Sequence, residues 1–135
     1  MDIYSQNIID HYKNPRNQGR LKDGNVAHNE VNYSCGDKLT VDLKVEQDKV
    51  ADFKFNGGGC AISQATMSIL SEDVTGKEVS AVLELNFSDI KKMLGVPISE
   101  RRMKCALLGL LTVQNAILKN KKQPLREWSS IVSEY

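Results

Sequence analysis

A chain of 135 residues is expected to form one domain, residues 1–135, and a domain of this size buries about two thirds of the surface that its unfolded chain exposes, so its core needs no metal or disulfide. The net charge of +1 argues against binding nucleic acid or an anionic membrane through bulk charge, and the longest apolar run, residues 106–111, is too short to span a bilayer. The chain has three cysteines, and its N-terminus shows no export signal. Together these observations predict thiol chemistry or metal binding in the reducing cytoplasm.

The first predicted element is a short amphipathic helix over residues 2–13. Apolar side chains recur at intervals of four from Tyr4 to Tyr12 and would form one stripe. Pro15 then disfavours helical conformation in the residue before it, which predicts the end of the helix. His11 lies inside this helix, and a surface or packing role is its simplest interpretation.

The middle of the chain predicts a small antiparallel sheet. A polar, glycine-bearing loop over residues 17–25 leads into a weak strand pattern over 26–33. Apolar and polar residues then alternate over 39–45 and again over 50–55, with a turn at Gln47–Asp48 between them. Three such strands would have one apolar face that needs a cover.

Helical patterns in the rest of the chain supply that cover. Gly76 marks the end of the first of these helices, and Ser88 is a candidate cap for the third. The predicted helices, with a final short helix or ordered tail, cover residues 61–74, 78–85, 88–94, 99–119 and 124–135.

A glycine-rich stretch stands between the last strand and the first of these helices. Gly57, Gly58 and Gly59 allow a tight loop that other groups can approach closely, and Cys60 follows at once. A thiol at a helix N-terminus lies at the positive end of the peptide dipoles, which favours the thiolate. This stretch therefore predicts a reactive or ligating sulfur.

The other two cysteines also lie in informative places. Cys35 begins a Cys-Gly-Asp step between two strands, where a turn can direct Cys35 and Asp37 to one side. Cys105 lies in the longest helix, one turn after Arg101 and Arg102 and one turn before Gly109. A guanidinium there would favour the thiolate, and the glycine would leave room for an inorganic group or for another backbone.

Three sulfurs and one carboxylate are enough for a tetrahedral site, which zinc accepts. Iron–sulfur clusters usually take four cysteines, so an aspartate in place of one of them is a harder and more weakly held ligand. Such a set suits a protein that builds a cluster and passes it on. From spacing alone, three unrelated buried cysteines and an ordinary turn aspartate remain the alternative.

The chain resembles the U-type iron–sulfur cluster assembly scaffolds, the family of IscU, SufU and NifU N-terminal domains, over essentially its full length. Four motifs occur in the family's order and carry the resemblance. They are Ile9-Asp10-His11-Tyr12-Lys13-Asn14-Pro15-Arg16-Asn17 with Gly19; Cys35-Gly36-Asp37; Gly59-Cys60-Ala61-Ile62-Ser63 with Ala65, Ser68, Glu72 and Gly76-Lys77; and Arg102-Met103-Lys104-Cys105.

The resemblance implies an α+β domain with a three-stranded antiparallel sheet covered on one face by helices. It also implies that Cys35, Asp37, Cys60 and Cys105 converge and bind a [2Fe-2S] cluster, or zinc in its place. Members of the family receive persulfide sulfur from a cysteine desulfurase and pass clusters to acceptor apoproteins. A homodimer is a further expectation for the cluster-bound state.

Two departures from the family pattern separate this chain from both of its branches. In the IscU branch a histidine precedes the third cysteine, and a Leu-Pro-Pro-Val-Lys motif is recognised by a dedicated Hsp70-type chaperone. Here Lys104 stands at the histidine position and residues 95–98 are Gly-Val-Pro-Ile, so the resemblance does not carry the chaperone over. The Arg-x-Lys-Cys form is similar to SufU, although the span from Cys60 to Cys105 lacks the SufU insertion.

The first hypothesis is therefore a scaffold and not an enzyme, with Asp37 as the exchangeable ligand and Arg102 pairing with Asp37 when the site is empty. The alternative is a zinc-dependent sulfurtransferase, in which Cys105 accepts persulfide sulfur while Arg102 captures the released Asp37. A plain zinc-stabilised structural domain is the third interpretation. The size of the core and the carboxylate ligand disfavour it.

Overall fold

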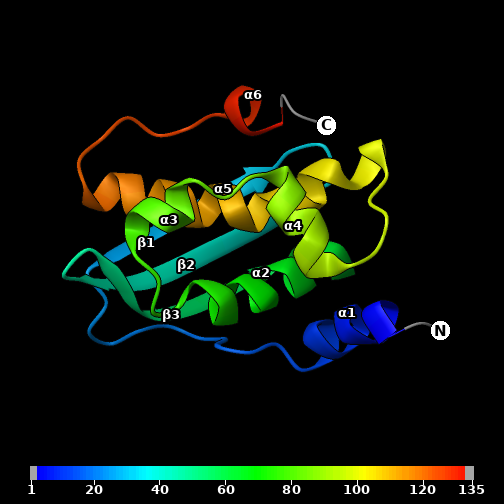
Figure 1. Cartoon of the computed structure of the whole chain (residues 1–135), viewed down its shortest axis with the longest axis horizontal. Coiled ribbons are helices and arrows are strands. Elements are labelled where there is room, and N and C mark those ends of the chain that lie inside the picture. Colours follow the sequence, from blue (N-terminus) through cyan, green and yellow to red (C-terminus); the bar gives the residue numbers. More distant parts are fainter. Residues whose placement is uncertain (1–2, 133–135) are drawn as a thin grey trace.

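The computed structural model describes residues 3–132 of the chain, so the parts of the first and last predicted elements at positions 2 and 133–135 lie outside the described residues. One helix comes first, three strands follow it, and the remaining helices come last, in the order that the sequence predicts (Figure 1). In order they are α1 (Ile3–Lys13), β1 (Val26–Asn32), β2 (Asp37–Glu46), β3 (Lys49–Gly58), α2 (Ala61–Val74), α3 (Val79–Leu83), α4 (Phe87–Leu94), the 3-10 turn η1 (Glu100–Arg102), α5 (Met103–Asn120) and α6 (Trp128–Ile131).

The three strands form an antiparallel sheet in the order β1-β2-β3. The β2–β3 hairpin turns at Gln47 and Asp48, whose φ angles of 51° and 58° are those of the tight turn that matches the twist of paired strands. Alternate residues of β2, such as Val41 and Leu43, are buried in the core, as the period of two predicts. The expected three-stranded sheet is confirmed.

Helices α2 and α5 cover the apolar face of the sheet and pack against each other, which confirms the α+β fold with helices on one face (Figure 1). The helix α1 lies beside α2. There His11 is buried, and its Nδ1 is 2.7 Å from the Ser68 hydroxyl, which also accepts from the backbone N–H of Arg16 at 2.9 Å. The predicted packing role of His11 is therefore confirmed.

Two helix starts differ from the sequence prediction. Helix α4 begins after Asn86, whose side chain accepts from the backbone of Asp89 while Asp89 accepts from Asn86 in return, so this reciprocal cap replaces Ser88. Helix α5 begins at Met103 and not at Ser99, because the preceding turn is wound as 3-10 helix. Periodicity of apolar residues cannot distinguish these two windings over a single turn.

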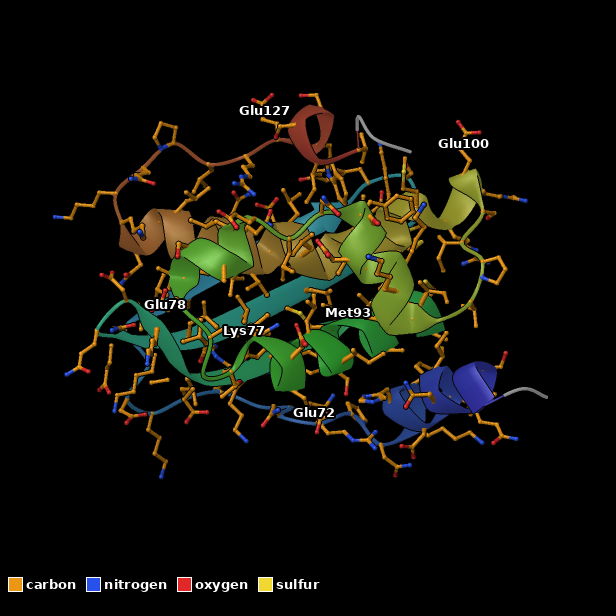
Figure 2. All side chains as sticks on the ribbon, viewed as in Figure 1. Glu72, Lys77, Glu78, Met93, Glu100 and Glu127 are labelled. Carbon is orange, nitrogen blue, oxygen red and sulfur yellow. The ribbon has the colours of Figure 1, made fainter. Side chains whose placement is uncertain are left out.

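The C-terminal half of α5 carries two fully buried amides that hold the following segment. Asn115 donates to Glu30 Oε2 at 2.7 Å and to the Arg126 carbonyl at 3.0 Å, and accepts from the Arg126 N–H at 2.7 Å. Gln114 donates to two carbonyls near α3 and accepts from Arg126 Nη1 at 2.6 Å. We call this the Gln114–Asn115 clamp. Figure 2 shows Glu127, next in the chain, pointing outward from the held segment.

Among the described residues, no helix combines the length and the apolar content that crossing a bilayer requires.

Candidate metal centre

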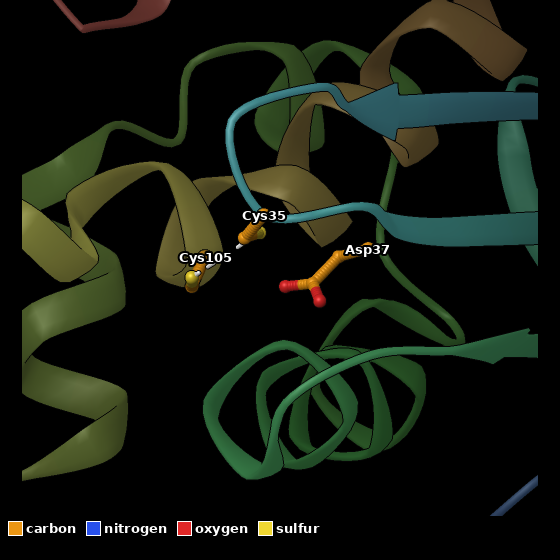
Figure 3. Close-up of side chains that lie close together, drawn as sticks. All are labelled: Cys35, Asp37 and Cys105. Carbon is orange, nitrogen blue, oxygen red and sulfur yellow. Dashed lines mark hydrogen bonds between the residues drawn. The ribbon is translucent and has the colours of Figure 1, made fainter.

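Three of the four predicted ligands meet at one end of the sheet. Cys35 comes from the turn between β1 and β2, Asp37 is the first residue of β2, and Cys105 lies in the first turn of α5 (Figure 3). One ligand atom from each lies within 4.8 Å of the others, and the two sulfurs are 3.9 Å apart. These residues are 70 positions apart at most, so only the tertiary fold brings them together.

The fourth residue, Cys60, is the N-cap of α2, as the sequence predicts. Its Sγ is 3.3 Å from the Ser63 hydroxyl, and it also interacts with the sulfur of Cys105. Cys60 lies outside the group whose ligand atoms are all within 4.8 Å of one another. It is therefore a neighbour of the trio, on the side of α2.

Asp37 is buried, with 4% of its surface exposed, and α2 holds its carboxylate. The backbone N–H of Cys60 donates to Oδ1 at 3.1 Å, and the Ser63 hydroxyl donates to Oδ2. Burial alone would raise the pKa of Asp37, but the hydrogen bonds from Ser63, Cys35 and Cys60 outweigh it and lower that pKa. Asp37 is thus kept as a carboxylate, which is the form that binds metal.

The glycine stretch is needed for this arrangement at two positions. Gly57 has a φ of +153°, and a Cβ there would lie 2.2 Å from the Lys38 carbonyl oxygen of the neighbouring strand. A Cβ on Gly59 would lie 2.7 Å from the carboxylate of Asp37. Glycine at position 59 therefore lets the carboxylate approach the start of α2, as the predicted close approach requires.

Cys105 is in a different state from the one that the sequence predicts. Only 3% of its surface is exposed, and burial, followed by the nearby sulfurs of Cys60 and Cys35, raises its pKa to about 12. Arg102 does lie close to Cys105 and Cys60, and these sulfurs raise the pKa of the guanidinium. Burial nevertheless prevails, so Cys105 is a thiol until a metal or a base removes its proton.

Two further expectations need correction. Within residues 3–132 no ion pair joins Arg102 to Asp37: Ser63 and the backbone of Cys60 hold the carboxylate, and Arg102 interacts with the sulfurs of Cys105 and Cys60. Of the two roles expected for Gly109, the close approach of another backbone is confirmed, whereas room for an inorganic group is not found. A Cβ there would meet Met67 Sδ at 3.2 Å, so this glycine permits the close packing of α5 on α2.

A cavity of about 710 Å³ is lined by Cys35 and Cys105 and opens a path to them from outside. Cationic side chains line it, and Lys104 is also held by an aromatic contact, with its Nζ 5.7 Å from the centre of the Trp128 ring. Glu100 is on its outer side and points away from the molecule in Figure 2. The lining residues are Asn32, Ser34, Cys35, Glu100, Arg101, Arg102, Met103, Lys104 and Cys105.

Two residues of the site were missed by the sequence analysis. Ser63 connects Asp37 with Cys60, and its position three residues after Cys60, one helical turn on, was the signal available in the sequence. Asn32 donates from Nδ2 to Cys35 Sγ at 3.1 Å, and no pattern distinguished it from other polar strand residues.

The donor set fits the groups that the resemblance implies. Thiolates and a carboxylate suit tetrahedral zinc, and thiolates hold the iron of iron–sulfur clusters. The convergence of two sulfurs and the carboxylate beside a cavity also rules out three unrelated buried cysteines, because Cys35 is exposed and lies 3.9 Å from Cys105.

Comparison with known proteins agrees with this geometry. The family model for the NifU-like N-terminal domain matches residues 3–127. The zinc-dependent sulfurtransferase SufU of Bacillus subtilis is 33% identical over 88% of this chain and 92% of its own length. The iron–sulfur cluster assembly scaffold protein IscU of Aquifex aeolicus is 37% identical over 84% of this chain and 73% of its own.

The fold is shared as well. The crystal structure of FiSufU from Fervidobacterium islandicum superposes with a TM-score of 0.69 at 31% identity, over 85% of this chain and 96% of that protein. The matched motifs, the fold and these relatives agree with one another, and the chain belongs to the NifU-like N-terminal domain family of U-type iron–sulfur cluster assembly scaffolds.

Proposed function

We propose that this protein is a scaffold on which a [2Fe-2S] cluster is assembled from iron and persulfide sulfur and then passed to acceptor apoproteins. The cluster is the cargo of the protein. Cys35, Cys60 and Cys105 supply thiolates, and Asp37 supplies the exchangeable fourth ligand. The observation that carries the proposal is the convergence of Cys35, Asp37 and Cys105 within 4.8 Å.

The chain's own groups support each part of this role. Asp37 is held as a carboxylate by Ser63 and by the start of α2, so it offers an oxygen ligand without any proton loss. Burial raises the pKa of Cys105 to about 12, so a metal that binds this sulfur has to displace its proton. The adjoining cavity gives a sulfur donor or an acceptor protein access to the sulfurs.

Anaerobic reconstitution with iron and sulfide tests the scaffold function. The wild-type chain should become coloured and hold iron and acid-labile sulfide in equal amounts. Cys35→Ser, Cys60→Ser and Cys105→Ser should each abolish the colour, whereas Ser34→Ala, in the same turn as Cys35, should not. A colourless wild-type product, or a Ser34→Ala variant as impaired as the cysteine variants, would contradict the proposal.

The similarity to the Bacillus subtilis sulfurtransferase supports a second candidate function. In that function zinc occupies the same donors, and one cysteine, with Cys105 as the predicted acceptor, receives persulfide sulfur from a cysteine desulfurase. Metal analysis of protein purified without oxygen separates the two functions, together with desulfurase turnover measured with and without the chain. A stable zinc protein that accelerates the desulfurase and forms no cluster would favour the sulfurtransferase.

Both functions require a cysteine desulfurase as a partner, and the scaffold also requires apoprotein acceptors. A homodimer in the cluster-bound state and a cytoplasmic location remain predictions. Gel filtration of the reconstituted and the metal-free protein tests the homodimer, which predicts a larger species only when the cluster is bound.

A further inference from the structure

Asn32, the last residue of β1, is buried and controls the turn that carries Cys35. Only 3% of its surface is exposed. Its Nδ2 donates to Cys35 Sγ at 3.1 Å, and its Oδ1 accepts from the backbone N–H of Ser34 at 3.2 Å. Its carbonyl oxygen accepts from the N–H groups of Cys35 at 3.3 Å and Gly36 at 2.8 Å. One residue therefore contacts both the backbone of the turn and the sulfur.

The contact with the sulfur matters because Cys35 is exposed on a turn, where few side chains restrict its rotamer. A free cysteine side chain can occupy three staggered positions about χ1. The Asn32 amide favours the one in which Sγ lies 3.9 Å from the sulfur of Cys105. Cys105 needs no such donor, since packing in α5 already buries it.

A hydrogen bond to a sulfur also changes its chemistry. An N–H donor draws electron density from the lone pairs of the sulfur, and such bonds are among the factors that tune metal–thiolate centres. Of the two sulfurs that face each other, Cys35 is the one with this amide donor at 3.1 Å. The pair is therefore unequal before any metal binds.

We propose that Asn32 is a positioning residue, whose N–H···S hydrogen bond holds the Cys35 sulfur toward Cys105 and lowers its donor strength toward a bound metal. The metal-binding half of this inference rests on the proposed function. The positioning half concerns the metal-free chain alone, so the two halves are tested by separate measurements.

Oxidation of the metal-free chain with diamide tests the positioning half. Diamide takes two electrons and two protons from the thiols of Cys35 and Cys105 and becomes a hydrazine, while an S–S bond forms. The variant Asn32→Asp keeps the Oδ1 acceptor and the shape of the side chain but replaces the N–H donor by oxygen. Asn32→Ala removes both, and Asn29→Ala alters an exposed asparagine of the same strand.

Peptide mapping should show the Cys35–Cys105 disulfide forming about threefold more slowly in Asn32→Asp and Asn32→Ala than in the wild type, because three rotamers replace one. Asn29→Ala should react at the wild-type rate. A wild-type rate in Asn32→Asp would overturn the positioning role, since the turn without the N–H donor would then be sufficient. Thermal unfolding of Asn32→Asp verifies that the variant is folded.

Binding of Co²⁺ tests the metal half. Removal of the N–H donor should move the sulfur-to-cobalt charge-transfer band to longer wavelength, because the sulfur of Cys35 is then a stronger donor. An unchanged band in both Asn32 variants would overturn this half. A wild-type chain that binds no Co²⁺ would overturn the proposed function itself, and the diamide rates would still decide whether Asn32 positions Cys35.

Discussion

The buried polar groups at the two ends of α5 differ in the partners that surround them. At its C-terminal end, every amide nitrogen and oxygen of Gln114 and Asn115 has a partner within the chain, on Arg126, Glu30 or backbone carbonyls. At its N-terminal end, the sulfur of Cys105 faces other sulfurs and a cavity. One end of the helix is closed, and the other end has capacity left to bind.

The difference shows how a structural polar cluster can be told from a binding site. Burial is similar in both, since Asn115 is fully buried and Cys105 is 3% exposed. What differs is the kind of group: an amide network with all its partners present stabilises one conformation, whereas converging sulfurs and a carboxylate are groups that can also bind a metal.

Substitution at the closed end should have the largest effect on stability. Asn115→Ala removes three hydrogen bonds and leaves the Arg126 N–H without its partner. The free energy of unfolding should fall by about 3 kcal/mol, measured by urea denaturation. Gln123→Ala, which removes an exposed amide from the same segment, should cost less than about 0.5 kcal/mol. Equal losses of unfolding free energy in Asn115→Ala and Gln123→Ala would contradict the view that the C-terminal end of α5 is a stabilising polar cluster.

At the open end, substitution should change chemistry more than stability. Asp37 is the weakest of the proposed ligands and the one whose exchange lets a cluster leave. A cluster reconstituted on Asp37→Ala should therefore leave about tenfold more slowly, a change of roughly 1.4 kcal/mol in the barrier. The measurement is transfer to an apo-ferredoxin. Glu100→Ala is the matched control, because this carboxylate lines the same cavity on its outer side. Transfer at the wild-type rate from Asp37→Ala would exclude the exchange role.

His11 is a third buried polar group. Like the amides at the closed end of α5 it has a partner within the chain, the Ser68 hydroxyl. Burial, with a smaller contribution from Arg16, lowers the pKa of His11. The folded chain therefore binds fewer protons than the unfolded chain. This stabilisation is present above the unfolded-state pKa of about 6.5 and decreases as the pH falls below it.

Urea denaturation at a series of pH values measures this effect. The wild type should lose stability between about pH 7.5 and about pH 5.5, and His11→Asn should lose less over the same range. If His11→Asn kept the full dependence, His11 would not be the group responsible.

The smallest change in the free energy of unfolding is expected for loss of an exposed ion pair. Lys77 Nζ lies 2.9 Å from Asp73 Oδ2, four residues earlier, and 43% of the lysine side chain is exposed. Lys77→Met should change the free energy of unfolding by about 0.3 kcal/mol or less, since water screens the pair. A loss as large as that of Asn115→Ala would show that burial is not what makes the clamp important.

Much of the fold could be predicted because its signals are local. The alternation in β2 and β3, the turn at Gln47–Asp48 and the end of α2 before Gly76 all depend on neighbours within a few residues. The starts of α4 and α5 were predicted less well. A reciprocal cap at Asn86 and one turn of 3-10 helix before Met103 are choices between hydrogen-bond patterns that apolar spacing does not register.

The sequence by itself determined the candidate site residues: the cysteines, the aspartate after Cys35 and the glycines before Cys60 stand out by type and by spacing. Only the tertiary structure decided their states. Cys105 is buried as a thiol and Asp37 is bound by Ser63 and not by Arg102. Likewise, Asn32 holds the sulfur of Cys35. Burial and hydrogen bonding between distant segments set the protonation and direction of a side chain, and neither can be read from the order of residues.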